Sequence, residues 1–300
     1  MNARDADSAA LPTLVRRVAV LLEAGVAPQA VWRFAGHGLG AAGVRSEEIA
    51  AAPPHELADA IARAGRGDPT WLALAAAWAV ATASGAPLAT ALRAFAELLR
   101  GFADAARRAG VALAGPRATA RLVVVMPLVG LVFGVALGQD SIGVLIGSPI
   151  GWVCLALGGG LLLAALAWNR ALLRAAAIGD RWPGLAPELI ATAMTGGASV
   201  ERACAIVHTV LTRYGITPDL ARVEAALAVA TAAGAPVAEL LRAEADEARR
   251  AAIAEAETRA ERLSVTLMLP LGVCVLPAFV LLGVVPLLVA VVSSTVEVIG

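Results

Sequence analysis

Among the residues that could do chemistry, a group of glycines matches a nucleotide-binding pattern. Gly38-Leu39-Gly40-Ala41-Ala42-Gly43 matches the dinucleotide fingerprint, whose glycines let the backbone approach a pyrophosphate. That chemistry requires a strand before the glycines and a strand–helix–strand unit around them. The preceding segment, Val31 to Ala35, has helical character instead. The pattern therefore predicts a loop rather than a cofactor site.

Other side chains that could do chemistry are scattered. The chain has no lysine, so it lacks the Walker lysine, and any ATP hydrolysis would have to come from a partner. The three histidines have no carboxylate or cysteine at ligand spacing: His37, His55 and His208. The three cysteines stand alone, as small buried hydrophobes do: Cys154, Cys204 and Cys274. We predict no catalytic residue, no cofactor, no metal site and no enzymatic activity.

Composition indicates a membrane protein. Apolar residues make up 59% and charged residues 16%, and the mean hydropathy is +0.77. The 24 basic and 24 acidic residues balance, and they form no basic stripe of the kind that binds nucleic acid. We therefore expect a lipid bilayer as partner and no nucleic acid.

Two spans are predicted in the middle of the chain. Between Leu122 and Trp168 the only charge is Asp140, which lies in a short polar turn. Residues 122–138 and 142–168 are each apolar and long enough to cross a bilayer. They predict a transmembrane hairpin over residues 121–168.

A further membrane segment is predicted over residues 263–296, which carry no charge. This segment is long for one crossing and short for two. Pro270, Pro277 and Pro286 each remove a helical hydrogen bond and favour a kink. One kinked crossing is the preferred interpretation, and a tight second hairpin is the alternative.

Arginines set the expected orientation. Four precede the first span, namely Arg107, Arg108, Arg117 and Arg121, and three follow the second, namely Arg170, Arg174 and Arg181. The turn between the spans has none. By the positive-inside rule the two charged blocks, residues 1–120 and 169–262, face the cytoplasm.

Both blocks are predicted to be helical bundles, so the fold class is all-α. A long amphipathic helix follows the Ser84-Gly85-Ala86-Pro87 break, with apolar residues at three- and four-residue steps. An internal repeat relates the blocks, because residues 79–87 recur as residues 228–236 with eight of nine identical. The second block is shorter, and the extra residues of the first, Gly36 to Pro69, predict a loop with one short helix near His55 to Ala64.

Three sets of residues are candidates for structural or binding roles. Turns are expected at Gly25, Pro28, Gly85, Pro87, Gly197, Gly234 and Pro236. Close packing of membrane helices is expected at Gly130, Gly134, Gly138, Gly143, Gly147 and Gly151. Candidate partner-facing charges are Arg93, Glu97, Arg107, Arg108, Arg242, Arg249 and Arg250. For the charged faces the simpler alternative is a solvated, partly ion-paired surface.

Taken together, the repeated helix–glycine–helix units, each running into a membrane segment, resemble the type II secretion system F family. The hairpin over residues 121–168 and the run from Leu269 to Pro286 make the chain most similar to the Tad (Flp) pilus branch. That resemblance implies a non-enzymatic platform protein of the bacterial inner membrane, which couples a cytoplasmic ATPase to the assembly of pilin or pseudopilin subunits. It also implies a homo-oligomer or a pair with a paralogous platform protein.

A small membrane transporter and a membrane-bound helical adaptor are the alternative functions. A transporter can also show repeats and proline-broken spans. Its path normally needs ionisable residues within the membrane, and the predicted spans have none away from their ends. An adaptor would lack an ATPase partner.

Overall fold

The structure is a computed structural model that describes residues 3–112, 148–175, 182–266, 269, 271–286 and 288–289. Over these residues the chain is helical and contains no strand, which confirms the predicted all-α class. The predicted first span, 122–138, lies outside the described residues. The helices before it are α1 (Ala3–Glu23), α2 (Ala30–Ala35), α3 (Ala41–Ala50), η1 (Pro54–Glu56), α4 (Leu57–Ala64), α5 (Pro69–Ser84) and α6 (Leu88–Ala112).

The helices after it are α9 (Pro149–Ala175), α10 (Leu185–Thr195), α11 (Val200–Arg213), α12 (Leu220–Ala233), α13 (Val237–Thr266), η2 (Leu271–Val275), α15 (Leu276–Phe279) and η3 (Val280–Val284). The chain forms two compact units. Unit 1 comprises Met1–Ala106 and Ile178–Glu255, and unit 2 comprises Arg107–Ala177 and Ala256–Gly300. The proposed block boundaries stay a prediction, but unit 1 draws helices from both charged blocks.

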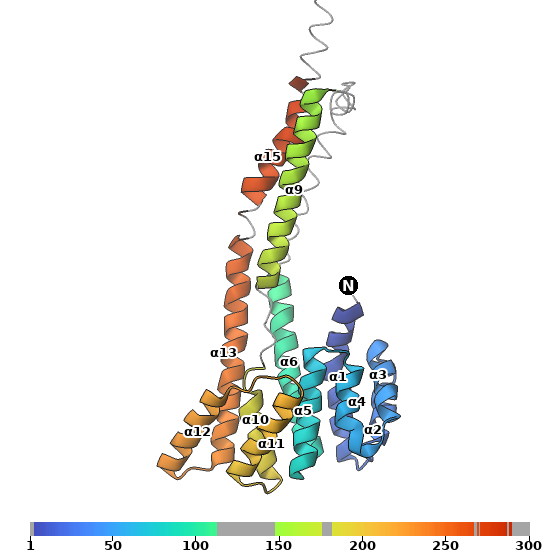
Figure 1. The fold of residues 1–300 in the computed structure, drawn as a ribbon, viewed down its shortest axis with the longest axis vertical. Coiled ribbons are helices and arrows are strands. Elements are labelled where there is room, and N and C mark those ends of the chain that lie inside the picture. The colour runs from blue at the N-terminus through green and yellow to red at the C-terminus, as the bar shows by residue number, and fades with distance from the viewer. Residues whose placement is uncertain are drawn as a thin grey trace, which may run out of the picture. The chain divides into compact units, whose positions relative to one another are not determined.

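Helix α5 is the centre of unit 1. Its buried residues, including Trp71, Leu74 and Trp78, lie on every side of the helix, as in a helix enclosed by others. It packs against α4 from the first block and against α10 and α11 from the second (Figure 1). Burying such large side chains contributes about 1.5–3 kcal/mol each. The two blocks therefore share one hydrophobic core.

The repeated sequence forms the same turn twice. At the end of α5, the N–H groups of Gly85 and Ala86 both donate to the carbonyl of Ala81. At the end of α12, those of Gly234 and Ala235 donate to the carbonyl of Ala230. Both glycines have positive φ, +73° and +63°, where a side chain is disfavoured. The repeat of the blocks as a whole stays a prediction.

The predicted loop between Gly36 and Pro69 is wrong in part, because α3 lies within it as well as α4. Helix α3 packs against α1, α2 and α4, so tertiary contacts stabilise a short segment whose glycine-rich start favoured a loop. One of the three fingerprint glycines, Gly43, serves this packing. A Cβ on Gly43 would lie 2.5 Å from the Gly36 carbonyl oxygen, so the pair lets α3 approach the end of α2.

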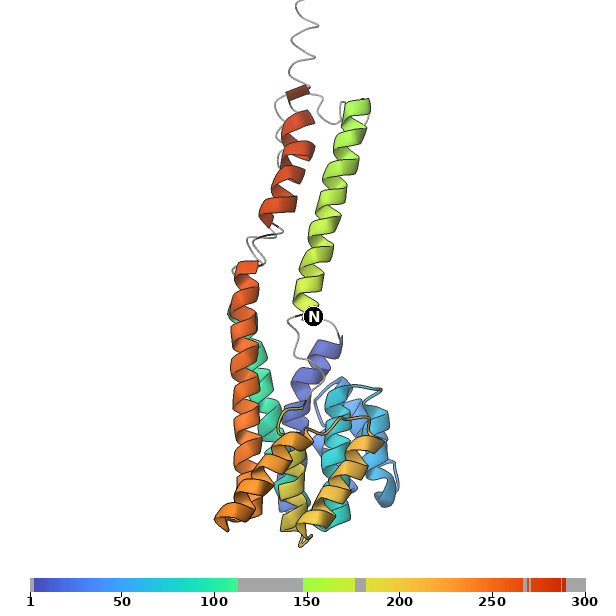
Figure 2. The same ribbon diagram turned by 60° about the vertical axis from the view of Figure 1, so that its left-hand side comes forward.

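Unit 2 contains the apolar helices. Among the described residues, one helix is long and apolar enough to cross a membrane, over Gly151–Trp168 of α9, and a shorter apolar helix covers Gly272–Val284. Helix α9 lies beside the segment 271–286, here called the C-terminal helix (Figures 1 and 2). Around Pro277 the C-terminal helix has π-helical turns, η2 and η3, as expected where proline interrupts the hydrogen-bond ladder. A single crossing of residues 263–296 stays a prediction.

Candidate functional site

A groove in unit 1 brings together charges from the two sequence blocks. It lies between α6 and α13 and has a volume of about 350 Å³. Its lining residues are Ala94, Glu97, Leu98, Gly101 and Phe102 from α6, and Asp246, Arg249, Arg250 and Ile253 from α13. Three of the seven predicted partner-facing residues thus surround one surface depression, which no single block could form.

Helix α6 forms the apolar wall of the groove. Gly101 faces α13, where a Cβ would be in ordinary van der Waals contact with Ile253 Cδ1 at 3.5 Å. Phe102 and Phe95 on the same helix pack on Trp182, with ring centroids 6.0 and 6.4 Å away. Trp182 precedes α10, so these contacts attach the start of the second block to α6.

Two neighbouring arginines on α13 differ in their surroundings. Arg249 is only 17% exposed, and its two terminal nitrogens each lie 3.2 Å from Glu188 Oε2, which is on α10. Arg249 also pairs with Asp246. Arg250 is 71% exposed and pairs with Glu247 at 3.4 Å. Arg249 therefore fixes α13 against α10, whereas Arg250 presents its charge to solvent.

Replacing these two arginines should separate the structural role from the surface role. We expect Arg249→Ala to lower the free energy of unfolding by about 2–3 kcal/mol, because it leaves the Glu188 carboxylate without its partner. We expect Arg250→Ala to change it by less than about 0.5 kcal/mol, since exposed ion pairs contribute little. Thermal denaturation followed by circular dichroism checks both. Equal losses would contradict the assignment.

The other predicted partner-facing charges lie apart from the groove wall. Arg93 pairs with Glu23 of α1, and Arg242 pairs with Glu239 at 2.7 Å on its own helix. In unit 2, Arg108 Nε lies 2.7 Å from Glu257 Oε1, which joins α6 to α13. Arg107 is exposed. Their role in binding partners stays a prediction.

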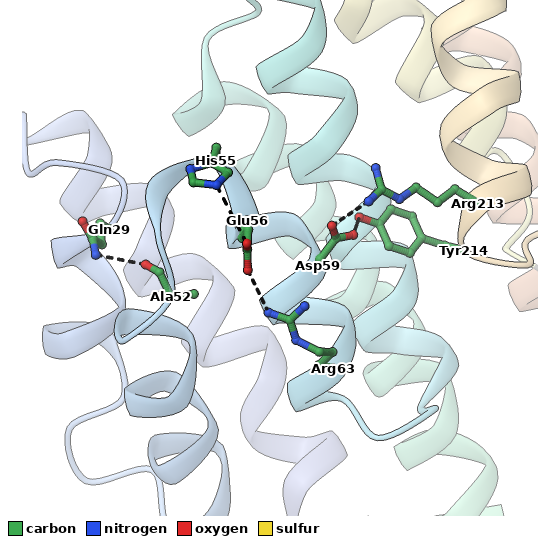
Figure 3. Close-up of polar contacts among 8 residues, drawn as sticks. All are labelled: Gln29, Ala52, His55, Glu56, Asp59, Arg63, Arg213 and Tyr214. Carbon is green, nitrogen blue, oxygen red and sulfur yellow. Dashed lines mark hydrogen bonds and ion pairs between the residues drawn. The ribbon is translucent and has the colours of Figure 1, made fainter.

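A polar contact between the blocks was not foreseen from sequence. Arg213 Nη2 donates to Asp59 Oδ2 at 2.6 Å, and the Tyr214 hydroxyl donates to Asp59 Oδ1 at 3.0 Å (Figure 3). Asp59 is on α4, Arg213 is the last residue of α11, and Tyr214 is the C-cap that follows it. Burial, followed by the nearby Asp59, raises the pKa of Tyr214 well above its usual range, so the phenol stays a donor. No local sequence signal relates residues this far apart.

Figure 3 also shows smaller contacts around α4. Glu56 accepts from Arg63 at 3.5 Å on the helix surface, and Gln29 donates to the Ala52 carbonyl at 3.0 Å. The Gln29 contact anchors the chain between α3 and η1 to the start of α2. These contacts stabilise the segment from Gly36 to Pro69, which the first block contains and the shorter second block lacks.

The start of α11 carries a pH-sensitive group. Ser199 caps the helix by accepting from the Arg202 N–H at 3.3 Å. A backbone hydrogen bond and then a hydrogen bond with Ser199 lower the pKa of Glu201 below its usual 4.5. Because the folded-state pKa is lowered, the charged Glu201 stabilises the fold above about pH 4.5 and this contribution disappears as pH falls through the folded-state value.

We therefore expect Glu201→Gln to lower the melting temperature at neutral pH and to have progressively less effect as the solution is acidified below pH 4.5. Melting curves of the wild type and variant at a series of pH values measure this difference. Glu247→Gln is the control, because no helix N-terminus is involved there. A difference that grew on acidification would contradict the assignment.

The predicted turn glycines lie at turns, yet the tightest glycine contacts lie elsewhere. Gly25 and Gly197 have φ of +84° and +88°, with open space where a Cβ would be. At neighbouring Gly196, by contrast, a Cβ would lie 2.3 Å from the Ser84 carbonyl oxygen. At Gly184 it would lie 2.4 Å from that of Ala245. Both close contacts join distant segments, so only the tertiary structure reveals them.

The predicted membrane-packing glycines fall mostly outside the described residues. Five of the six lie outside, namely Gly130, Gly134, Gly138, Gly143 and Gly147. The sixth, Gly151, is buried in α9. The close contact that the structure does describe is at Gly158, where a Cβ would lie 2.5 Å from Leu282 Cγ. Further along the same pair of helices, Ala165 is buried with Cys274 and Val275. Gly158 was not among the predicted residues.

Reactive side chains stay dispersed in the part of the chain that the structure describes. The three cysteines are free there, and no cluster of three or more histidine, cysteine or acidic side chains that could hold a metal occurs among the described residues. Burial, with a further contribution from the charge of Glu201, raises the pKa of the Cys204 thiol. This thiol is therefore a poor nucleophile.

Comparison with known proteins adds one finding. Residues 157–285 match the family model described as Type II secretion system (T2SS), protein F. The match begins inside α9, includes α10 to α13 and ends within the C-terminal helix. No curated protein and no solved structure matches the chain. The family consists of inner-membrane platform proteins of secretion and pilus-type machines. The predicted resemblance to the type II secretion system F family is thus confirmed over residues 157–285, whereas the similarity to the Tad (Flp) branch stays a prediction.

Proposed function

We propose that this protein is an inner-membrane platform of a Tad-type pilus or type II secretion machine. In this role it couples a cytoplasmic ATPase to the assembly of pilin or pseudopilin subunits and catalyses no reaction itself. The observation that carries the proposal is the family match over residues 157–285, because it joins an apolar helix, a helical bundle and a second apolar helix in one domain.

The arrangement of charge supports a scaffold with two kinds of surface. Unit 1 has a charged exterior around one apolar core, and its groove between α6 and α13 presents Glu97 and Arg250 to solvent. Unit 2 carries exposed apolar side chains on α9 and the C-terminal helix. A water-soluble motor would contact the first surface, and lipid or pilin helices would contact the second.

We place both charged blocks in the cytoplasm and the apolar helices in the inner membrane, with homo-oligomers or a paralogous subunit as the assembly. The arginines flanking the predicted spans support this orientation. Single cysteines introduced at Glu97 and Glu297 in a variant without native cysteines test it. Labelling of position 297 from the cytoplasmic side would overturn a single third crossing.

Co-purification with a cytoplasmic secretion ATPase tests the function. We expect the solubilised wild-type protein to retain the ATPase, and we expect deletion of the gene to abolish pilus assembly. Replacing Glu97 with Arg together with Arg250 with Glu should reduce retention, because both charges face the groove and neither is buried. Arg63→Glu is the matched control on an exposed, weakly paired position of α4.

The outcomes separate the candidate roles. Intact pilus assembly after deletion, together with no ATPase retention, would overturn the platform function. Retention that survives the groove double variant would overturn only the assignment of the groove as the motor contact.

A further inference from the structure

The apolar helices of unit 2 have a marked exposed surface. On α9 the exposed side chains include Trp152 (60%), Leu163 (69%) and Trp168 (42%), and on the C-terminal helix they include Val273 and Leu276 (each 60%). Side chains of this size are rarely left in water as a continuous surface. A bilayer is the partner that fits an apolar face on both helices.

The two tryptophans lie toward opposite ends of the apolar part of α9: Trp152 is near the helix start at Pro149, and Trp168 is the last residue before the chain becomes polar. Tryptophan is enriched at the two membrane–water interfaces, where its ring meets hydrocarbon and its N–H meets headgroups. Beyond Trp168 the chain becomes polar with Asn169 and Arg170. At the other end Ser148 caps α9, with its Oγ accepting from the Gly151 N–H at 2.9 Å. A helix start exposes backbone N–H groups that hydrocarbon cannot satisfy, so it belongs near an interface.

The C-terminal helix lies alongside the same part of α9. Ala165 of α9 is buried with Cys274, and Gly158 packs against Leu282, so the two helices run antiparallel in register. Continuing that register places Trp168 level with Gly272 and Trp152 level with Leu288. The shorter apolar helix begins at Gly272. Over residues 156–168 of α9 the two helices therefore share one apolar band.

We propose that α9 and the C-terminal helix lie in the bilayer with Trp152 and Trp168 in its two headgroup regions, and that the protein fits a locally thin membrane. The tryptophans are sixteen positions apart, which corresponds to a rise of about 24 Å at about 1.5 Å per residue. A typical hydrocarbon core is about 30 Å thick. The inference rests on the proposed membrane location but not on the ATPase or on pilus assembly.

Depth-dependent fluorescence quenching tests the register. The full-length protein is reconstituted in phosphatidylcholine vesicles whose acyl chains are brominated either near the headgroup or near the bilayer centre. We expect the emission lost in Trp152→Phe, and that lost in Trp168→Phe, to be the component quenched by shallow bromines. Trp182→Phe is the control, because Trp182 packs on Phe95 and Phe102 in unit 1 and its emission should be insensitive to both lipids.

A second measurement tests the thickness without substitutions. We expect the melting temperature of the wild-type protein to be highest in vesicles of short myristoleoyl lipids and to fall through oleoyl to long erucoyl lipids. Quenching of either tryptophan mainly by deep bromines would overturn the register, and so would the absence of quenching in vesicle-bound protein. A maximum in oleoyl or erucoyl lipids would overturn the thin-membrane fit. Loss of pilus assembly in cells bears on the platform function alone.

Discussion

Gly196→Ala should strongly destabilise the helical bundle of unit 1, although it adds only one methyl group. Gly196 has φ of −78°, which alanine adopts freely, so the substitution causes no backbone strain. The added methyl group would lie 2.3 Å from the Ser84 carbonyl oxygen and 2.7 Å from the Ala86 nitrogen. Both are backbone atoms of the Gly85 turn, which cannot rotate away. We expect a loss of about 3 kcal/mol, at the upper end of what overpacking costs.

The neighbouring glycine provides the matched comparison. Gly197 has open space around its Cα but a φ of +88°, so Gly197→Ala should cost only about 1–2 kcal/mol from backbone strain. Asparagine tolerates this conformation better than alanine, so Gly197→Asn should recover part of the loss. Gly196→Asn should recover nothing, because its problem is space.

Thermal denaturation in detergent measures both positions. For a unit of this size about 1 kcal/mol shifts the melting temperature by about 2–4 °C, so the two alanine variants should be separable. A Gly196→Ala variant as stable as Gly197→Asn would show that the α10 end does not approach the Gly85 turn. That result would contradict the packing of the two blocks into one unit.

Gly158→Ala should loosen the pair formed by α9 and the C-terminal helix. The new Cβ would lie 2.5 Å from Leu282 Cγ, a branch point near the backbone that cannot simply swing aside. Small residues at such contacts let membrane helices approach closely, and packing is a main source of their association. The expected loss is about 1–3 kcal/mol of helix association.

Two further variants show whether the contact itself is responsible. Gly160→Ala is made on the same helix with nothing within 4 Å of the new methyl group, so it should be neutral or slightly stabilising. Leu282→Ala in the Gly158→Ala background removes the opposing side chain and should restore part of the association.

Oxidative cross-linking reports on the helix pair directly. Ala165→Cys is introduced beside native Cys274, with which Ala165 shares a buried cluster, in a variant whose other two cysteines are replaced. We expect Gly158→Ala to slow the cross-link and Gly160→Ala to leave its rate unchanged. Equal rates in both variants would contradict close packing at Gly158.

Local features of this protein were predictable because their causes are local. The turn at Gly85 follows from a glycine that tolerates positive φ and a proline that suits a first helical turn. The all-α class follows from hydrophobic periodicity, and the apolar helix α9 follows from a charge-free run. In each case neighbouring residues carry the whole signal.

Helix α3 marks where local reasoning stops. Its glycine-rich start predicted a loop, and isolated helices this short are marginal in water. The segment becomes helical because Gly36 and Gly43 lie in contact and bring α2 and α3 together. That contact also gives Gly43, one glycine of the dinucleotide fingerprint, a role in helix packing.

What the sequence determined by itself is therefore the all-α class, the turn at Gly85 and the family to which residues 157–285 are similar. The tertiary structure alone decided that the two charged blocks share one core, that Arg249 binds Glu188 while Arg250 faces solvent, and that Gly158 meets Leu282. The physical reason is distance along the chain. Periodicity and turn chemistry act within a few residues, whereas contacts between residues far apart depend on how all the helices pack at once.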